Sequence, residues 1–78
     1  MIGIILKNMR LSAKLSQEKL GKKLNMADTT ISSYERENSQ PDFNTIVNIA
    51  KICGYEFIIK DKDKNIISLD EMAKEKDF

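Results

Sequence analysis

The stretch from Leu15 to Glu35, LSQEKLGKKLNMADTTISSYE, restricts the fold of this 78-residue chain more than any other. Its apolar residues recur at helical spacing over about residues 17–24, and again from Ala27 or Asp28 to Glu35. This spacing predicts two short amphipathic helices with a turn of three residues between them. The second helix carries small hydroxyl side chains, and on pattern alone these fit a solvated face as well as a binding surface. They are Thr29, Thr30, Ser32 and Ser33.

Two longer helices are expected on either side of this pair. The first covers about residues 2–13, and its apolar face is formed by Ile2, Ile5, Leu6, Met9 and Ala13. The other covers about residues 43–53, where Asp42 is the N-cap and Gly54 the C-terminal stop. Its expected buried stripe consists of Phe43, Ile46, Val47, Ile49, Ala50 and Cys53.

Local signals also mark the ends of the short helices. Ser16 is the expected N-cap of the first, and Asn25 ends it because Asn tolerates the left-handed conformation. Gly21 weakens this helix by about 1 kcal/mol relative to Ala, which makes sense if the backbone of another helix crosses closely there. Asp28 either caps the next helix or favours its positive N-terminal end.

The C-terminal part changes period. YEFIIK (55–60) and NIISL (65–69) are rich in β-branched and aromatic residues and flank the polar DKDK, which predicts a β-hairpin. Asp61, Asp63 and Asn65 have the spacing that opens a calcium loop, but Ile66 and Met72 stand where such a loop needs Gly and Glu. The acidic pair therefore indicates a hairpin turn. Residues 70–78 are expected to form a frayed helix or a disordered tail.

Composition excludes several function classes. Residues 1–55 hold eight Lys/Arg and five Asp/Glu, whereas residues 56–78 hold five and seven, so only the first part is mildly basic. There is no His, and the lone Cys53 lies on an expected buried face as a reduced thiol, so we expect no enzyme, no cofactor and no metal site. MIGIIL is too short for a signal peptide or a membrane span, so we expect a cytoplasmic protein without membrane contact.

Several separated blocks resemble the helix-turn-helix domain of phage repressors and Cro proteins, the Xre family. They are Arg10, LSQEKL at 15–20, ISSYE at 31–35, Asn38, Pro41, IVNIAK at 46–51 and Gly54, and they span about residues 2–55. The resemblance implies a mainly α chain, with a compact four-to-five-helix repressor-like domain, to which this sequence adds a C-terminal β-hairpin. It also implies that the helix at about 28–35 lies in the DNA major groove.

Residue roles follow from the same resemblance. Base contacts are implied for Asp28, Thr29 and Ser33, and Asp28 would be less free to read a base if it capped its own helix. Positions implied to lie on phosphate or at the groove margin are Gln17, Thr30, Ser32, Arg36 and Asn38. Arg10 and Glu35 are implied to form a structural ion pair that joins the first helix to the third.

The expected organisation is a DNA-binding domain at 1–55, a hairpin at 56–69 that is a candidate dimerisation element, and a charged tail at 70–78. The exposed end of the fourth helix is the alternative dimerisation surface. We expect a prophage-type, sequence-specific regulator, most simply a repressor, that binds double-stranded DNA as a homodimer. The alternative is an antitoxin-like or adaptor module that binds a protein partner such as a toxin or an antirepressor. Both can hold, because antitoxins of this family repress their own operons.

Overall fold

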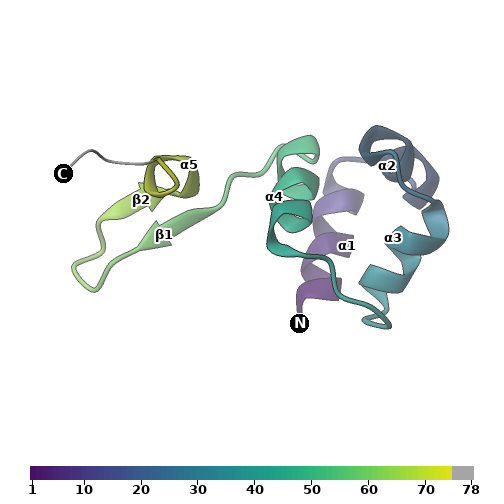
Figure 1. Cartoon of the computed structure of the whole chain (residues 1–78), viewed down its shortest axis with the longest axis horizontal. Coiled ribbons are helices and arrows are strands. Elements are labelled where there is room, and N and C mark those ends of the chain that lie inside the picture. The colour runs from purple at the N-terminus through teal and green to yellow at the C-terminus, as the bar shows by residue number, and fades with distance from the viewer. Residues whose placement is uncertain (75–78) are drawn as a thin grey trace.

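The computed structural model describes residues 1–74, which form a four-helix bundle followed by a small hairpin and a short helix (Figure 1). This confirms the predicted mainly α fold with a C-terminal hairpin. The fifth helix comes after the hairpin. In chain order the elements are α1 (Ile2–Ser12), α2 (Gln17–Leu24), α3 (Asp28–Glu35), α4 (Phe43–Ile52), β1 (Ile58–Lys60), β2 (Ile66–Ser68) and α5 (Leu69–Met72).

Side-chain caps and left-handed residues account for most of the helix ends. The hydroxyl of Ser16 accepts the N–H of Lys19, and a carboxylate oxygen of Asp42 accepts the N–H of Thr45, so both predicted N-caps are present. Asn25 ends α2 in the left-handed conformation, with φ 57°. The N-cap of α3 is Ala27, which has no capping side chain. Asp28 is therefore the first helical residue and not a cap.

The core lies among the four helices of the bundle. Its buried members are Leu6, Met9, Leu20, Ile31, Ile49, Ala50 and Cys53. Two predictions of buried residues were wrong. Ile5 is 39% exposed, because it lies on the flank of α1 beside the buried Leu6. Phe43 is 59% exposed, because its ring lies against that of Phe57 in the arm, at a centroid distance of 6.3 Å, and not in the core.

Residues 55–74, which we call the arm, lie to one side of the bundle (Figure 1). β1 and β2 pair antiparallel, with Ile59 opposite Ile67. The strands are shorter than the predicted 55–60 and 65–69. At the first end, the N–H of Tyr55 donates to the carbonyl of Ala50 and closes the C-terminus of α4, while Gly54 takes φ 85°. At the second end, Leu69 already begins α5.

The hairpin turn is closed by Asp61. One of its carboxylate oxygens accepts the backbone N–H groups of Asp63 and Asn65, both at 2.9 Å. The acidic residues therefore serve the turn itself. The tail predicted at 70–78 begins inside α5, which Ser68 caps, and residues 75–78 lie outside the described part of the chain. Within residues 1–74, no helix has the length and apolar character needed to cross a membrane.

Candidate nucleic-acid interface

The two short helices are held at a fixed angle by their connecting turn and by two buried side chains. Leu20 of α2 and Ile31 of α3 are both in the core. A Cβ atom on Gly21 would lie 2.5 Å from the carbonyl oxygen of Met26, whose N–H donates back to the carbonyl of Gly21. A close approach is present at Gly21 as predicted, but it is made by the turn that leads into α3 and not by another helix. Because this turn is so tight, α2 and α3 form a single unit.

The outer face of α3 is short and polar. Asp28 and Thr29 are exposed, whereas Thr30, Ser32 and Ser33 are half-buried at the margins. Thr29 and Ser33 are four residues apart, so they share one face of the helix. An α-helix with its side chains is about 10–12 Å across, and the DNA major groove is about 12 Å wide, so a helix with short side chains fits the groove. The arrangement can present a few hydroxyl groups and one carboxylate to a polar surface.

Asp28 stands at the positive end of α3, in its first turn. Among residues 1–74, its carboxylate makes no hydrogen bond or ion pair, and it is exposed. It is therefore free to accept hydrogen bonds from a ligand. A carboxylate cannot donate, so a partner at this point must offer N–H or O–H groups.

Ser33 is joined to the loop that follows α3. Its hydroxyl lies 2.8 Å from the hydroxyl of Ser39, and its carbonyl oxygen accepts the N–H of Asn38 at 2.9 Å. The backbone of Asn38 therefore closes the loop, while its exposed side chain points to solvent. The loop thus brings Ser39 beside a residue for which a base contact was predicted.

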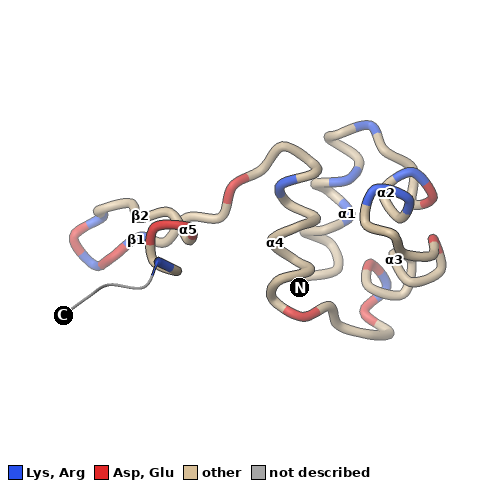
Figure 2. Tube along the Cα trace, turned by 45° about the horizontal axis from the view of Figure 1, so that its top comes forward, with Lys and Arg blue, Asp and Glu red and all other residues tan. Residues whose placement is uncertain are grey.

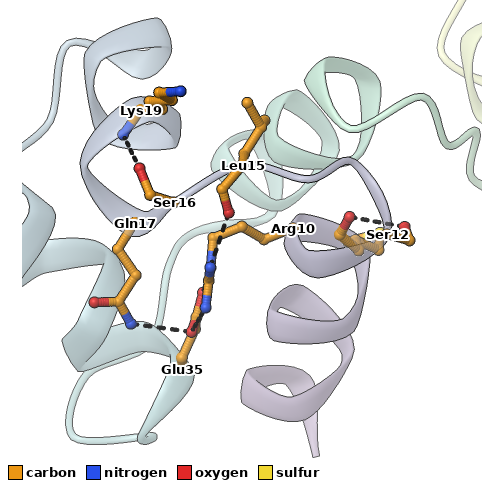
Figure 3. A network of polar contacts seen from close by, with 8 residues as sticks. Arg10, Ser12, Leu15, Ser16, Gln17, Lys19 and Glu35 are labelled. Carbon is orange, nitrogen blue, oxygen red and sulfur yellow. Dashed lines mark hydrogen bonds and ion pairs between the residues drawn. The ribbon is translucent and has the colours of Figure 1, made fainter.

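A buried ion pair connects α1 to the end of α3 (Figure 3). The guanidinium of Arg10 donates to both carboxylate oxygens of Glu35, with N–O distances of 2.6 and 2.9 Å, and also to the carbonyl of Leu15 at 2.9 Å. The two side chains are only 9% and 4% exposed. Since every buried polar side-chain atom in the described residues has a hydrogen-bond partner, the pair is well satisfied and fixes α3 to α1.

The charge state of this pair follows from its surroundings. Burial alone would raise the pKa of Glu35, but hydrogen bonds from Arg10 and Gln17 and the positive charge of Arg10 outweigh it, so the pKa lies below its ordinary value. The hydrogen bond to Glu35 raises the pKa of Arg10 above its ordinary value. Both groups are therefore ionised at neutral pH.

Gln17 extends the ion pair toward the surface at the start of α2. Its amide nitrogen donates to Glu35 at 3.1 Å (Figure 3). An amide NH₂ has two hydrogens, so a second one is available for an external acceptor. The first backbone N–H groups of a helix have no acceptor within it and favour anions. The start of α2 can therefore hold an anion such as a phosphate.

Lys and Arg residues lie mainly along the chain of the bundle, whereas the turn of the hairpin carries residues of both signs (Figure 2). Those nearest to the α2–α3 unit in sequence are Lys19, Lys22 and Lys23 on α2 and Arg36 after α3. Lys22 pairs with Glu18 at 3.2 Å, but both are exposed, so the pair is weak and easily exchanged for another partner. The positive charge around α2 and α3 therefore favours the binding of a polyanion only modestly.

The exit of α3 also packs against the start of α1. The carboxylate of Glu37 accepts the N–H of Gly3 at 3.0 Å. A Cβ atom on Gly3 would lie 2.5 Å from the carbonyl oxygen of Glu35 and 2.8 Å from that of Tyr34. The first turn of α1 therefore lies directly against the last backbone carbonyls of α3.

Sequence reasoning missed Ser39 and Glu37, since ENSQP indicated only a break between helices. The partners of these side chains are Ser33 and Gly3, which lie 6 and 34 residues away. A Ser in a loop after a helix signals a local hydrogen bond in general, but nothing in the sequence names its partner.

Comparison with known proteins adds independent information. A family model described as "Helix-turn-helix" matches residues 6–59. Over 71 residues the chain is 28% identical to an uncharacterized HTH-type transcriptional regulator, YqaE, of Bacillus subtilis (strain 168). The match covers 88% of this chain and 61% of that protein, so the chain spans about three fifths of the relative's length. No solved structure matches the chain significantly.

Proposed function

The chain belongs to the Xre-like helix-turn-helix family, and on that premise we propose that it is a DNA-binding transcriptional regulator that reads a specific sequence as a homodimer. The observation that carries this proposal is the rigid α2–α3 unit with a short, polar and outward-facing α3. In the proposed complex α3 enters the major groove and α2 crosses above it.

Base recognition is assigned to Asp28, Thr29 and Ser33. Asp28 can only accept, so in the groove it selects a base with an exocyclic amino group, such as cytosine. Thr29 offers both a hydroxyl and a methyl group, and the methyl group suits the methyl of thymine. The exposure of Asp28 and Thr29 supports this assignment, because neither side chain is needed by the core.

Phosphate contacts are assigned to the margins of the same surface. Gln17 offers its second amide hydrogen at the start of α2, and Arg36 offers an exposed positive charge after α3. The remaining members of this set are the half-buried Thr30 and Ser32 and the exposed Asn38. Such contacts set the position of the protein on the duplex without reading its sequence.

Dimerisation is assigned to the arm. A two-stranded hairpin is marginally stable in water by itself, yet this one exposes Ile58, Ile59 and Ile66. A second copy that covers these side chains would stabilise both hairpins. The two α3 helices would then read half-sites about one helical turn apart. Repression needs no more than occupation of such an operator, and we propose it as the direction of regulation.

The test is selection from random duplex DNA followed by sequencing, at two salt concentrations. Recovery of an inverted repeat with half-sites about 34–36 Å apart supports the proposal. Thr29→Ala and Ser33→Ala should each reduce discrimination by about 1–3 kcal/mol for the base pair concerned, whereas Ser12→Ala on α1 should leave it unchanged. No motif, with affinity that falls steeply with salt, would indicate non-specific binding and would favour the protein-interaction alternative.

The dimer is tested separately by sedimentation. Ile66→Lys places a charge on the exposed face of the hairpin and should weaken self-association at least about tenfold, since burying an unpaired charge costs several kcal/mol. Ile4→Lys is the matched control, because Ile4 is a similarly exposed isoleucine on α1 (55%, against 60% for Ile66). Equal effects of the two changes would remove the hairpin from the proposed interface.

A further inference from the structure

The loop after α3 folds back onto the last turn of that helix. Two consecutive backbone N–H groups, of Asn38 and Ser39, donate to the carbonyl of Ser33, at 2.9 and 3.4 Å. This geometry brings the hydroxyl of Ser39 to 2.8 Å from the hydroxyl of Ser33. Three hydrogen bonds therefore join the loop to one residue of α3, and Pro41, which is buried, holds the chain beyond them.

The partner of the Ser33 hydroxyl is unusual for a serine within a helix. Such hydroxyls often bond a carbonyl of the preceding turn in their own helix, as the hydroxyl of Ser12 does with the carbonyl of Met9 at 2.9 Å. Ser33 instead bonds a side chain outside its helix. Its rotamer is therefore set by Ser39.

This matters for reading a base. A free serine hydroxyl is both a donor and an acceptor and rotates to suit its partner, so it contacts different bases in the groove. When one side of the hydroxyl is already bonded to Ser39, only the remaining side faces outward. Either hydroxyl can donate in this bond, so what Ser39 fixes is the position of the Ser33 oxygen and not its donor or acceptor character. A hydroxyl oxygen held at one position reaches fewer base-edge atoms than a freely rotating side chain does, so it distinguishes base pairs by where those atoms lie.

We infer that Ser39 is a positioning residue for base recognition, holding the hydroxyl oxygen of Ser33 at one position and so restricting the base pairs that α3 accepts at this point. Ser39 acts through Ser33 and touches no base itself. The inference rests on the proposed function of α3 as a DNA-reading helix. It adds to that function a specificity-determining residue outside the recognition helix.

The experiment compares operator preference among variants of the full chain. The wild-type protein is first used to select a motif, and Ser33→Ala identifies the base pair whose preference it flattens. Ser39→Ala should flatten the same base pair by about three- to tenfold, which is less than the loss of a full bidentate contact, and leave the other positions unchanged. In Ser33→Ala/Ser39→Ala the second change should add nothing.

A matched pair controls for shape. Ser39→Thr keeps the hydroxyl and should retain the preference, whereas Ser39→Val has nearly the same shape without a hydroxyl and should lose it. This pair also serves if Ser39→Ala folds poorly, because the comparison then rests on two variants of equal size. Urea denaturation should show no more than a small difference in stability between Thr and Val, since the bond is exposed.

Three outcomes would overturn the inference. Unchanged preference in Ser39→Val would show that Ser33 is oriented without Ser39. An equal loss of affinity on every sequence would make Ser39 a phosphate contact. Additive effects of the two changes in the double variant would show that Ser39 acts independently of Ser33. If the wild-type protein selects no motif at all, the proposed function itself falls and the role of Ser39 with it, which is a result distinct from these three.

Discussion

The bundle and the arm are built on opposite principles. In the bundle, seven buried residues from four helices form one core, and a buried ion pair joins α1 to α3. In the arm, strands of three residues expose Ile58, Ile59 and Ile66, and α5 is a single turn. The difference teaches that the bundle holds its own shape, whereas the order of the arm depends on whatever covers its apolar side chains.

Most contacts between the two regions lie near the surface, although Phe57 of the arm is half-buried and packs against the core of the bundle. The ring of Phe43 meets that of Phe57, Lys51 pairs with Asp70 at 3.5 Å, and the hydroxyls of Ser12 and Tyr55 lie 2.6 Å apart. Exposed pairs of this kind contribute little to stability. An apolar groove between α4 and α5, lined by residues that include Val47, Leu69 and Met72, lies over this junction. The arm can therefore loosen while the bundle stays folded.

The largest effect is expected for the ion pair of the bundle. Arg10→Ala leaves the carboxylate of Glu35 buried without its main partner, and such losses cost about 3–5 kcal/mol. Urea denaturation measures the change. Lys22→Ala, which removes an exposed pair with Glu18, should cost no more than about 0.5 kcal/mol. Similar losses in the two variants would show that the buried pair does not hold the bundle together.

The next largest difference is expected between Ile→Ala substitutions in the bundle and in the arm. Ile49 is 1% exposed, and Ile49→Ala should cost about 2–5 kcal/mol because it leaves a cavity. Ile67→Ala, in the half-buried β2, should cost less than about 1 kcal/mol in global unfolding at low protein concentration, where no second copy covers the arm. A large loss for Ile67→Ala under these conditions would make the hairpin part of the folding unit.

Acid should weaken the bundle through Glu35. Its pKa in the folded chain lies below the ordinary 4.5, so its contribution to stability is complete above the unfolded pKa and is lost as pH falls through the folded pKa. Stability measured from pH 7 to pH 3 should therefore fall below about pH 4.5, and Glu35→Gln should remove part of this fall. Gln17→Ala deletes one donor to Glu35, so the folded pKa of Glu35 should rise toward its ordinary value and the total fall in stability should become smaller. An unchanged profile in Gln17→Ala would contradict the role of this hydrogen bond.

The smallest effect is expected for two helix N-caps that have nearly the same hydrogen-bond geometry. Ser16 caps α2 in the bundle, and Ser68 caps α5 in the arm, with N–O distances of 3.0 and 3.1 Å. Ser16→Ala should lower the free energy of global unfolding by about 1 kcal/mol. Ser68→Ala should leave it unchanged and speed amide hydrogen exchange only around α5. If both variants lose the same global stability, the arm and the bundle unfold together.

Elements with local signals could be predicted from the sequence. The bounds of α2 were predicted as 17–24, as observed, because Ser16 and Asn25 act on their own neighbours. The fourth helix was located equally well by Asp42 and Gly54. In each case the hydrogen bond or backbone conformation that ends the helix involves only residues a few positions apart. The helix end can therefore be predicted from the neighbouring sequence.

Features decided by distant residues could not be predicted in this way. Helical spacing put Ile5 and Phe43 on an apolar face, but the limit of the core depends on where other helices end. Likewise, Tyr55 has strand character and was drawn into the C-terminus of α4 by a hydrogen bond to Ala50. The candidate interface likewise has a predictable and an unpredictable part. The polar face of α3 could be predicted from helical periodicity, whereas the hydrogen bond between Ser33 and Ser39 in the following loop could not.

The packing of Gly3 couples the position of α1 to that of α3. A side chain at position 3 would push the first turn of α1 away from the carbonyls of Tyr34 and Glu35. Arg10 lies about two turns further along the same helix. A displacement of the first turn of α1 would therefore also move the guanidinium that binds Glu35. The angle between α1 and α3 therefore depends on the absence of a side chain at Gly3, directly beside the last carbonyls of α3.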